Sequence, residues 1–199
     1  MDFEDLLRRR RMVRAYEPTP VPSDVLRKIV WAARRAPSAG NTDALDILLL
    51  SGAEEVSAYW AVTLPQERRA SFKWRALVDA PALMVLWTRP EAYTDRYGEA
   101  DKAAQGLGEA QERWPVPYWW VDAGGAALAM QLAAQDAGLG CLFFTVGDHE
   151  NAVRARFGVP PDRRAVGALT FGYPVNDEPG LSVSRARRDP EDIVHRGTW

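Results

Sequence analysis

The feature of this sequence that most constrains its fold is a stretch of alanine and glycine from about Trp119 to Ala137. Almost every side chain in Asp122-Ala-Gly-Gly-Ala-Ala-Leu-Ala-Met-Gln-Leu-Ala-Ala is small or apolar, and the stretch is long enough for a substantial helix. Gly124 and Gly125 each cost roughly 1 kcal/mol relative to alanine in a helix interior. We therefore expect a central helix that is buried on most sides, with a neighbour packed directly against its backbone.

Short apolar runs of strand length occur at four other places in the sequence. The run over residues 82–88 is apolar on both faces, which predicts a strand in the middle of a sheet. The other three predicted strands cover residues 47–50, 141–146 and 165–172.

Helices are expected between and around these strands. Apolar residues recur at helical spacing between residues 23 and 35, and we also expect helix over 2–11, over 149–157 and within 53–79. Residues 89–118 are polar and aromatic without a clear period, and we interpret them as an insertion with some helix. The sum is an α+β fold. A length of 199 residues suits one domain over residues 1–199, although two small domains would also fit.

The composition argues against several classes of function. A formal net charge of −2 disfavours nucleic-acid binding, because a protein that neutralises phosphates normally carries a net basic face. Cys141 is the only cysteine, and His149 and His195 are the only histidines, so a disulfide, a thiolate cluster and a histidine-rich metal site are not expected. No stretch approaches the roughly 20 apolar residues that span a bilayer, and the acidic start lacks the apolar core of a signal peptide. We therefore expect a cytoplasmic chain without a metal, membrane or nucleic-acid partner.

The first motif with chemical potential is Arg9-Arg-Arg-Met-Val-Arg-Ala-Tyr16. A cluster of arginines near a chain end is most often a solvated surface. The functional interpretation is an anion site, because guanidinium groups bind phosphate through two hydrogen bonds and stay charged. The alternation of Arg10, Met12 and Arg14 would place these three side chains on one side of an extended segment.

The second motif is Ala36-Pro-Ser-Ala-Gly-Asn-Thr42, directly after the helix expected over 23–35. Proline, serine, glycine and asparagine commonly end a helix and form a turn. The functional alternative is a loop of small residues whose hydroxyl, amide and backbone groups lie against a flat heterocycle.

Taken together, the two motifs resemble the opening of the nitroreductase family: Arg-Arg-Ser-x-Arg-x-Phe, a helix ending in alanines, and Ala-Pro-Ser-x-x-Asn-x-Gln-Pro-Trp before a strand. The corresponding residues here are Arg10-Arg11-Met12-Val13-Arg14-Ala15-Tyr16 and Ala36-Pro37-Ser38-Ala39-Gly40-Asn41-Thr42-Asp43-Ala44-Leu45. The resemblance covers nearly the whole chain, and it continues through Trp120-Val-Asp-Ala-Gly, Ala137-Gly-Leu-Gly-Cys, Gly172-Tyr-Pro and Arg187-Arg-Asp-Pro-Glu-Asp-Ile-Val-His195.

The resemblance implies an FMN-dependent oxidoreductase with a nitroreductase-like fold, a central and mostly antiparallel sheet flanked by helices. It also implies a homodimer with the flavin at the subunit interface. NADH or NADPH would transfer a hydride to flavin N5 and leave, and a nitroaromatic, quinone-like or other small conjugated acceptor would then take the electrons. This chemistry requires no side-chain acid or base. The sequence has no Gly-x-Gly-x-x-Gly fingerprint, as expected if the nicotinamide stacks only transiently on the flavin.

The resemblance also assigns cofactor-binding residues. Arg10 and Arg11 would hold the FMN phosphate and ribityl chain, and Arg14 would lie at the pyrimidine end of the ring, where a cation stabilises reduced flavin. Arg187 and Arg188 in the tail would bind the phosphate from the other end of the chain. The remaining cofactor-binding positions are Met12, a loop beside the ring with Thr145 and Gly147, and a loop of the partner subunit with Pro37, Ser38, Ala39 and Asn41.

Three departures from the family pattern concern the affinity for FMN. Met12 replaces the usual serine and removes a hydroxyl donor. Asp43 replaces the usual glutamine and exchanges an amide for a negative charge, and Ala44-Leu45 replaces Pro-Trp. If the family's amide steadies the flavin or its loop, the replacement at Asp43 would lower the affinity for FMN.

Aromatic side chains in and after the insertion are candidates either for the substrate pocket or for simple packing. Tryptophan and tyrosine are enriched both in cores and at interfaces, so the two interpretations stay open. The four substrate candidates are Tyr93, Tyr97, Trp114 and Tyr118. Cys141 is expected in the core, and Asp122 is expected as a cap or hydrogen-bond partner rather than as a general base.

Two other interpretations compete with a general reductase. The chain could be a specialised flavoenzyme of the same fold, such as a dehydrogenase, a dehalogenase or a flavin-fragmenting enzyme. It could also be a non-catalytic binding protein of the same fold, which the replacements at Met12 and Asp43 would explain.

Overall fold

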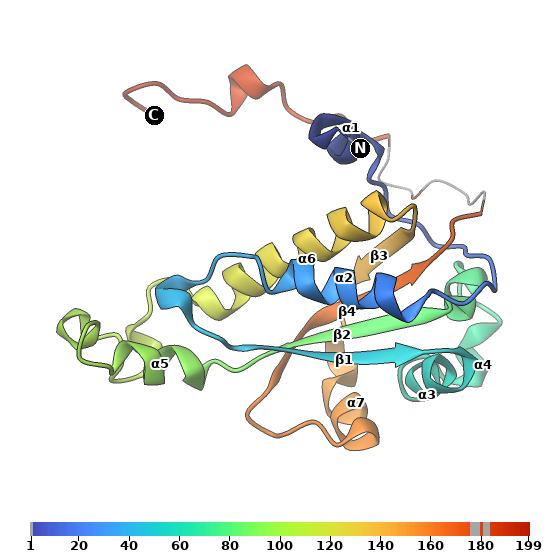
Figure 1. Ribbon diagram of the computed structural model, residues 1–199, viewed down its shortest axis with the longest axis horizontal. Coiled ribbons are helices and arrows are strands. Elements are labelled where there is room, and N and C mark those ends of the chain that lie inside the picture. The colour runs from blue at the N-terminus through green and yellow to red at the C-terminus, as the bar shows by residue number, and fades with distance from the viewer. Residues whose placement is uncertain (1, 176–179, 181–183) are drawn as a thin grey trace.

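The alanine-rich stretch forms the helix α6 (Tyr118–Asp136), which lies along one face of a four-stranded sheet (Figure 1). The structure is a computed structural model, and it describes residues 2–175, 180 and 184–199. The helix α2 (Ser23–Ala33) packs beside α6 on the same face. These two helices and the sheet make the larger part of the fold.

The sheet is antiparallel throughout, with the strand order β1-β2-β4-β3. Its second strand is buried at every position, which confirms the prediction of a central strand over residues 82–88. The four predicted strands are all present, and the α+β fold is confirmed. Their bounds are β1 (Leu45–Ser51), β2 (Ala82–Thr88), β3 (Gly140–Phe144) and β4 (Arg164–Gly172).

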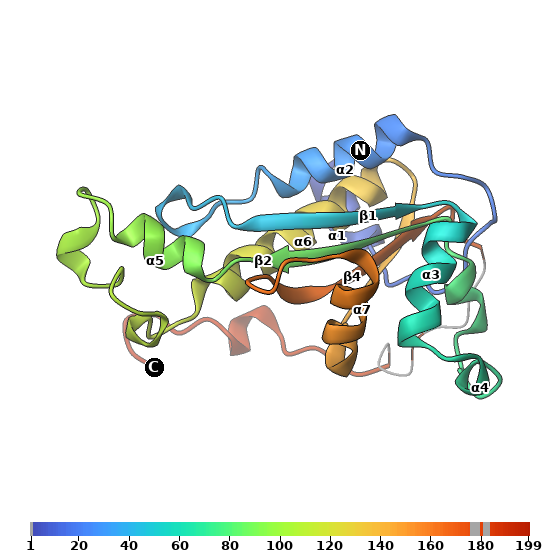
Figure 2. The same cartoon turned by 90° about the horizontal axis from the view of Figure 1, so that it is seen from below.

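Each face of the sheet has its own hydrophobic core, because alternate residues of β2 point to opposite faces. Met84 and Leu86 pack against α2 and α6. Leu83, Val85 and Trp87 pack on the other face, against the helices α3 (Ala53–Thr63) and α7 (Glu150–Phe157). The result is three layers, with helices covering both faces of the sheet (Figure 2).

Five shorter helices complete the fold. Most of them lie where helix was expected, and the one inside the insertion is α5. None of the helices in the described ranges has the length and apolar character needed to cross a membrane. Their bounds are α1 (Phe3–Arg9), α3 (Ala53–Thr63), α4 (Gln66–Arg69), α5 (Glu91–Tyr97) and α7 (Glu150–Phe157).

The expectation that α6 is enclosed on most sides by its own chain is wrong. Val121 and Leu128 are 52% and 46% exposed, and Gly124 and Gly125 lie on the same open side. A Cβ atom built at either glycine would meet no atom within 4 Å in the described part of the chain. The α2 helix, α1 and the sheet pack against other parts of α6, so the described residues leave one apolar stripe of this helix bare.

The insertion has a small core of its own. Tyr93, Tyr97, Trp114 and Trp119 are buried together, with their rings mostly edge to face. This cluster lies at the α5 end of the sheet, while α3 and α4 lie at the opposite end (Figures 1 and 2). The segment 184–199 extends away from the layered part of the molecule, and its side chains are exposed.

Candidate functional site

The arginine segment, residues 10–14, runs along the edge strand β3. The Val13 N–H donates to the Cys141 carbonyl at 2.9 Å, and Met12 and Cys141 form an isolated parallel bridge. Gly140 permits this contact, because a Cβ there would lie 2.7 Å from Cγ2 of Val13. Arg10, Met12 and Arg14 are half-buried and alternate with the buried Val13, in agreement with the expected extended segment.

Arg10 carries an unsatisfied polar atom. Its Nη1 is buried and has no hydrogen-bond partner among the described residues. A buried guanidinium nitrogen without an acceptor is costly, because it has lost water without gaining a replacement. An anion bound next to Arg10 would supply the missing acceptor.

Arg14 lies at the wall of a cavity of about 410 Å³, which we call the Arg14 cavity. Its guanidinium lies 4.8 Å from the ring centre of Trp74 and donates to the Met12 carbonyl at 3.1 Å. Thr145 and Val146 line the same cavity. The structure therefore brings Arg14 and Thr145, two residues to which the resemblance gives flavin contacts, to the same cavity. Gly147 follows directly, and its N–H donates to the Thr145 hydroxyl at 2.9 Å.

Most of the wall of the Arg14 cavity was not predicted. It is aromatic and comes from α3, from the segment before β2 and from the end of β3. The Trp60 and Phe144 rings stack with their centroids 5.8 Å apart. His149, to which the sequence gave no role, also lines the cavity. The unpredicted aromatic members of the wall are Tyr59, Trp60, Phe72, Trp74, Phe143 and Phe144.

Gly180 lies beside Arg14. A Cβ built at Gly180 would lie 3.2 Å from Nη1 of Arg14, so this residue is in close contact with the guanidinium. Farther along, Arg187 and Arg188 are exposed, and Arg188 donates to the Asp192 carbonyl. Arg11 is exposed as well. The joint binding of one phosphate by Arg10, Arg187 and Arg188 stays a prediction.

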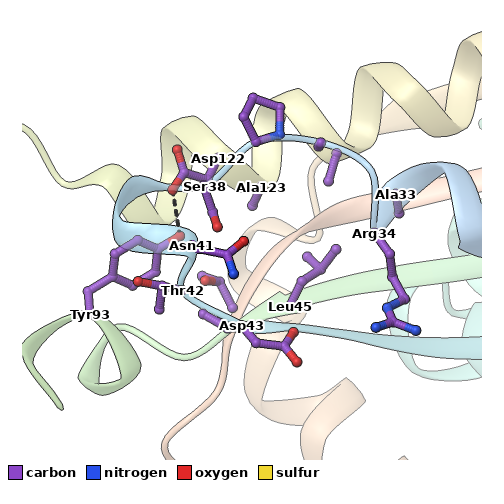
Figure 3. Close-up of a pocket in the computed structure, with 15 residues that line it drawn as sticks. Ala33, Arg34, Ser38, Asn41, Thr42, Asp43, Leu45, Tyr93, Asp122 and Ala123 are labelled. Atoms are coloured by element: carbon purple, nitrogen blue, oxygen red, sulfur yellow. Dashed lines mark hydrogen bonds between the residues drawn. The ribbon is translucent and has the colours of Figure 1, made fainter. Parts of the chain in front are cut away.

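The second predicted element is a loop that we call the Ser38 loop, residues 38–42. It contains a tight turn at Ala39–Asn41, in which Gly40 and Asn41 have φ angles of 65° and 55°. The Thr42 hydroxyl donates to the Ala39 carbonyl at 2.6 Å. Pro37, Ser38 and Asn41 line a separate pocket of about 390 Å³ (Figure 3).

Asp122 joins the Ser38 loop to α6 and to the insertion. Its Oδ2 accepts the Ala39 N–H at 2.8 Å, and it accepts the Tyr93 O–H at 2.9 Å (Figure 3). The sequence interpretation of Asp122 as a hydrogen-bond partner is confirmed. Burial raises the pKa of Tyr93, and the hydrogen bond to Asp122 raises it further, so this hydroxyl stays a donor.

The four substrate candidates lie in different surroundings. Tyr97 and Trp114 are 8% and 7% exposed and pack against each other in the insertion, as the packing alternative expects. Tyr93 is in the same cluster, but it also lines the pocket beside the Ser38 loop. Tyr118 is exposed at the start of α6. A substrate role for these four side chains stays a prediction.

The Arg14 cavity and the Ser38 loop lie at opposite ends of the sheet. The cavity is built partly from α3, at one end, and the loop lies beside α5, at the other (Figures 1 and 2). One chain therefore does not bring these two predicted halves of a site together.

The residues around the Arg14 cavity fit a flat aromatic ligand with an anionic tail. The cavity supplies aromatic walls and one cation, and Arg10 nearby on the chain supplies an unpaired donor for an anion. Among the described residues, no group of three or more His, Cys, Asp and Glu side chains is placed to hold a metal ion. The donor set suits FMN better than a metal.

A sequence profile described as the nitroreductase family matches residues 7–173 of the chain. Among curated relatives, an NADH dehydrogenase of Thermus thermophilus is 28% identical over 196 residues, with 89% of each chain covered. The match to the family profile, over residues 7–173, therefore includes the arginine segment, the Ser38 loop, α6 and the Arg14 cavity.

Solved structures with the same fold cover almost the whole chain. An FMN-dependent nitroreductase from Clostridium difficile superimposes with a TM-score of 0.68 at 21% identity, covering 98% of each chain. A nitroreductase-like protein from Streptococcus mutans gives a TM-score of 0.77 at 15% identity, covering 98% of this chain and 97% of that one. At these identities the two matches show the fold alone.

Proposed function

The chain belongs to the nitroreductase family, and we propose that it is a dimeric FMN-dependent oxidoreductase that passes electrons from NADH or NADPH to a small conjugated acceptor. Nitroaromatic and quinone-like compounds are the acceptor classes that a flat, aromatic site would favour. The NADH dehydrogenase name of the Thermus relative supports a nicotinamide donor.

The observation that carries this proposal is the pairing of the Arg14 cavity with the unsatisfied Arg10. Several aromatic side chains line the cavity, and Arg14 places a positive charge at its wall. The buried Nη1 of Arg10 has no acceptor in the described part of the chain. A ligand with a planar ring and a phosphate satisfies both features at once.

Each proposed contact follows from the chemistry of the side chain. Arg10 and Arg11 would bind the phosphate and ribityl chain, helped by Arg187 and Arg188, because guanidinium pairs with phosphate through two charge-assisted hydrogen bonds. Arg14 would hold the electron-rich pyrimidine edge of the ring, where its charge favours the reduced form. Thr145 and Gly147 would border the ring, with Met12 beside the ribityl chain. FMN, when bound, supplies the two-electron chemistry, and the protein supplies binding, orientation and charge.

We infer that a second copy of the chain completes this site. The bare stripe of α6 with Val121, Gly124, Gly125 and Leu128 is apolar and lets a partner's backbone approach closely. A partner bound there can bring its Ser38 loop, with Pro37, Ser38, Ala39 and Asn41, toward the Arg14 cavity. This arrangement would give two equivalent sites in a symmetric dimer.

The test of the proposed function is to purify the full chain and examine its flavin content. We expect a yellow protein with about one FMN per chain, whose visible absorption is lost on anaerobic addition of NADH or NADPH and returns on addition of an acceptor. A chain that binds FMN but does not react with either nicotinamide would favour a specialised flavoenzyme with another donor. A chain that FMN cannot reconstitute would refute the proposal and leave a non-catalytic binding protein.

A further inference from the structure

The insertion is linked to the backbone of the Ser38 loop at two positions, one through Asp122 of α6 and one directly. Tyr93 reaches the loop through Asp122, which also accepts the Ala39 N–H. Arg96 donates from its Nε to the Gly40 carbonyl at 2.9 Å. Consecutive residues of the loop are therefore tied to α6 and to α5.

The conformation of the Ser38 loop needs such support. Gly40 and Asn41 both have left-handed backbone angles, and Asn41 carries a side chain that pays a steric cost there. The position of Gly40 is also restricted by the insertion, because a Cβ there would lie 2.8 Å from Cε2 of Tyr97. Without outside contacts, a short turn of this kind would exchange among several conformations.

Asp122 makes the first of the two attachments. One carboxylate oxygen accepts both hydrogen bonds, at 2.8 Å from the Ala39 nitrogen and at 2.9 Å from the Tyr93 oxygen. Hydrogen bonds to an ionised acceptor are stronger than neutral ones. Tyr93 is almost fully buried, and it fixes the carboxylate in the orientation that faces the loop.

Arg96 is itself held in place. Its two terminal nitrogens each lie 2.7 Å from an oxygen of Asp101, which leaves Nε directed at the Gly40 carbonyl. The hydrogen bonds from Arg96 lower the pKa of the Asp101 carboxyl to about 2, so the pair stays charged at neutral pH. The insertion thus presents a fixed donor to the loop.

We propose that Asp122 is a positioning residue that, together with Tyr93 and Arg96, holds the Ser38 loop in the conformation with which Ser38 and Asn41 contact the flavin of the partner subunit. This inference rests on the proposed function. It also gives the insertion a specific role. The insertion would stabilise the Ser38 loop of its own subunit, and this loop would contact the flavin bound by the partner subunit. The side chains of Tyr93 and Arg96 act through the backbone of the loop and need not contact the flavin.

The experiment compares the full-length wild type with Asp122→Ala, Asp122→Asn, Tyr93→Phe and Arg96→Ala. The matched control is Asp95→Asn, which removes an exposed carboxylate from α5 without touching the loop. Hydrogen exchange of the backbone amides at residues 39–42 is followed in the FMN-free proteins, and FMN dissociation constants are measured by flavin fluorescence. Thermal unfolding of each variant separates a change in the loop from loss of the fold.

We expect Asp122→Ala to speed amide exchange at Ala39 by about tenfold and to weaken FMN binding by a similar factor, because each lost charge-assisted bond has that order of effect. Tyr93→Phe and Asp122→Asn should give smaller changes in the same direction, and Asp95→Asn should give none. The fine structure of the visible band of bound flavin should change in Asp122→Ala, whereas Asp122→Asn should restore part of it.

Two results would overturn the inference. One is unchanged Ala39 exchange in both Asp122→Ala and Tyr93→Phe. The other is faster exchange with an unchanged FMN dissociation constant, which would mean that the loop conformation does not matter for the flavin. Wild-type protein that binds no FMN refutes the proposed function instead, and the two failures are therefore distinguishable. If Asp122→Ala does not fold, Tyr93→Phe and Asp122→Asn decide the question.

Discussion

At the arginine segment, a buried guanidinium nitrogen of Arg10 has no acceptor among the described residues, whereas at the Ser38 loop the Asp122 carboxylate already binds two donors. The Arg14 cavity is mainly aromatic and apolar, with one cation at its wall. The pocket beside the Ser38 loop is lined by hydroxyl, amide and carboxylate groups. The two ends of the sheet are thus chemically different.

This difference suggests that the two ends of the sheet have different roles in binding the cofactor. The arginine segment has an unsatisfied donor among the described residues, Nη1 of Arg10, which a ligand can satisfy. The Ser38 loop is bonded to its own subunit through the Ala39 N–H and the Gly40 carbonyl, and it offers a preformed surface. If a dimer joins the two, one subunit binds the cofactor and the other presents a rigid loop to it, with little ordering cost at the moment of binding.

The largest effect is expected from the replacement Arg10→Met, which removes the unsatisfied guanidinium nitrogen of the arginine segment. FMN binding should weaken on the order of 100-fold, because the charge-assisted bonds to the phosphate are lost while an unbranched apolar stem is kept. The FMN-free protein should unfold at the same temperature or a higher one, since a buried unpaired nitrogen is removed. Titration with FMN and thermal unfolding measure the two quantities.

Arg9→Met is the matched control, because Arg9 is exposed at the end of α1. It should leave FMN affinity within about a factor of two, since it removes only a screened surface charge. If Arg10→Met instead destabilises the FMN-free chain without changing FMN affinity, Arg10 is a structural residue. The unsatisfied nitrogen of Arg10 then does not serve to bind the flavin.

A charge on the bare stripe of α6 tests the proposed dimer. It tests whether the Arg14 cavity of one subunit meets the Ser38 loop of another. Leu128→Asp should raise the concentration needed for dimerisation at least roughly tenfold, because a carboxylate would be buried without a partner in the interface. FMN affinity should fall with it, while the monomer keeps its fold. Light scattering over a dilution series, with FMN titration at each concentration, measures both effects.

Asn151→Asp is the control for this experiment, since it adds the same charge to an exposed position of α7. It should change neither assembly nor flavin binding. A Leu128→Asp protein that is monomeric and still binds FMN as tightly as the wild type would mean that one chain builds the whole site.

A smaller effect is expected from the aromatic wall of the Arg14 cavity. Trp74→Leu removes the ring that lies 4.8 Å from the Arg14 guanidinium. FMN affinity should fall roughly threefold, the size of an exposed cation–π contact. Phe157→Leu removes the ring beside Arg156 on α7, at 5.3 Å, and serves as the control with no expected effect on FMN. Equal FMN affinity in both variants would show that Trp74 does not shape the flavin site.

Much of this arrangement follows from local sequence. The strand over residues 82–88 was recognisable because a strand that is buried on both faces of a sheet has a continuous run of apolar side chains. The arginine segment and the Ser38 loop were recognisable as motifs, because each is a continuous run of residues. Asp122 was correctly expected to be a hydrogen-bond partner, although its two donors were not foreseen.

What the sequence did not predict depends on contacts between distant segments. Trp60, Trp74 and Phe144 share the Arg14 cavity only after α3, the segment before β2 and the end of β3 have packed together. The open side of α6 was missed for another reason. A run of small and apolar residues is the same whether a helix is covered by its own chain or by a second one, so burial within one subunit could not be told from burial in an assembly.

The smallest expected effect concerns Cys141, which reports on the arginine segment because β3 pairs there with Met12. Burial raises the pKa of its thiol to about 12, against an opposing effect of the Arg10 charge. Because the folded pKa is raised, the stability linked to the neutral thiol is complete below the ordinary cysteine pKa and is lost as the pH rises through about 12. At pH 8 the native thiol should therefore react with a disulfide reagent such as Ellman's reagent only on opening of this end, and FMN should slow the reaction further. Rapid labelling of the native, FMN-bound protein would show that the arginine segment does not stay packed on β3. The arginine segment would then not be an ordered part of the flavin site.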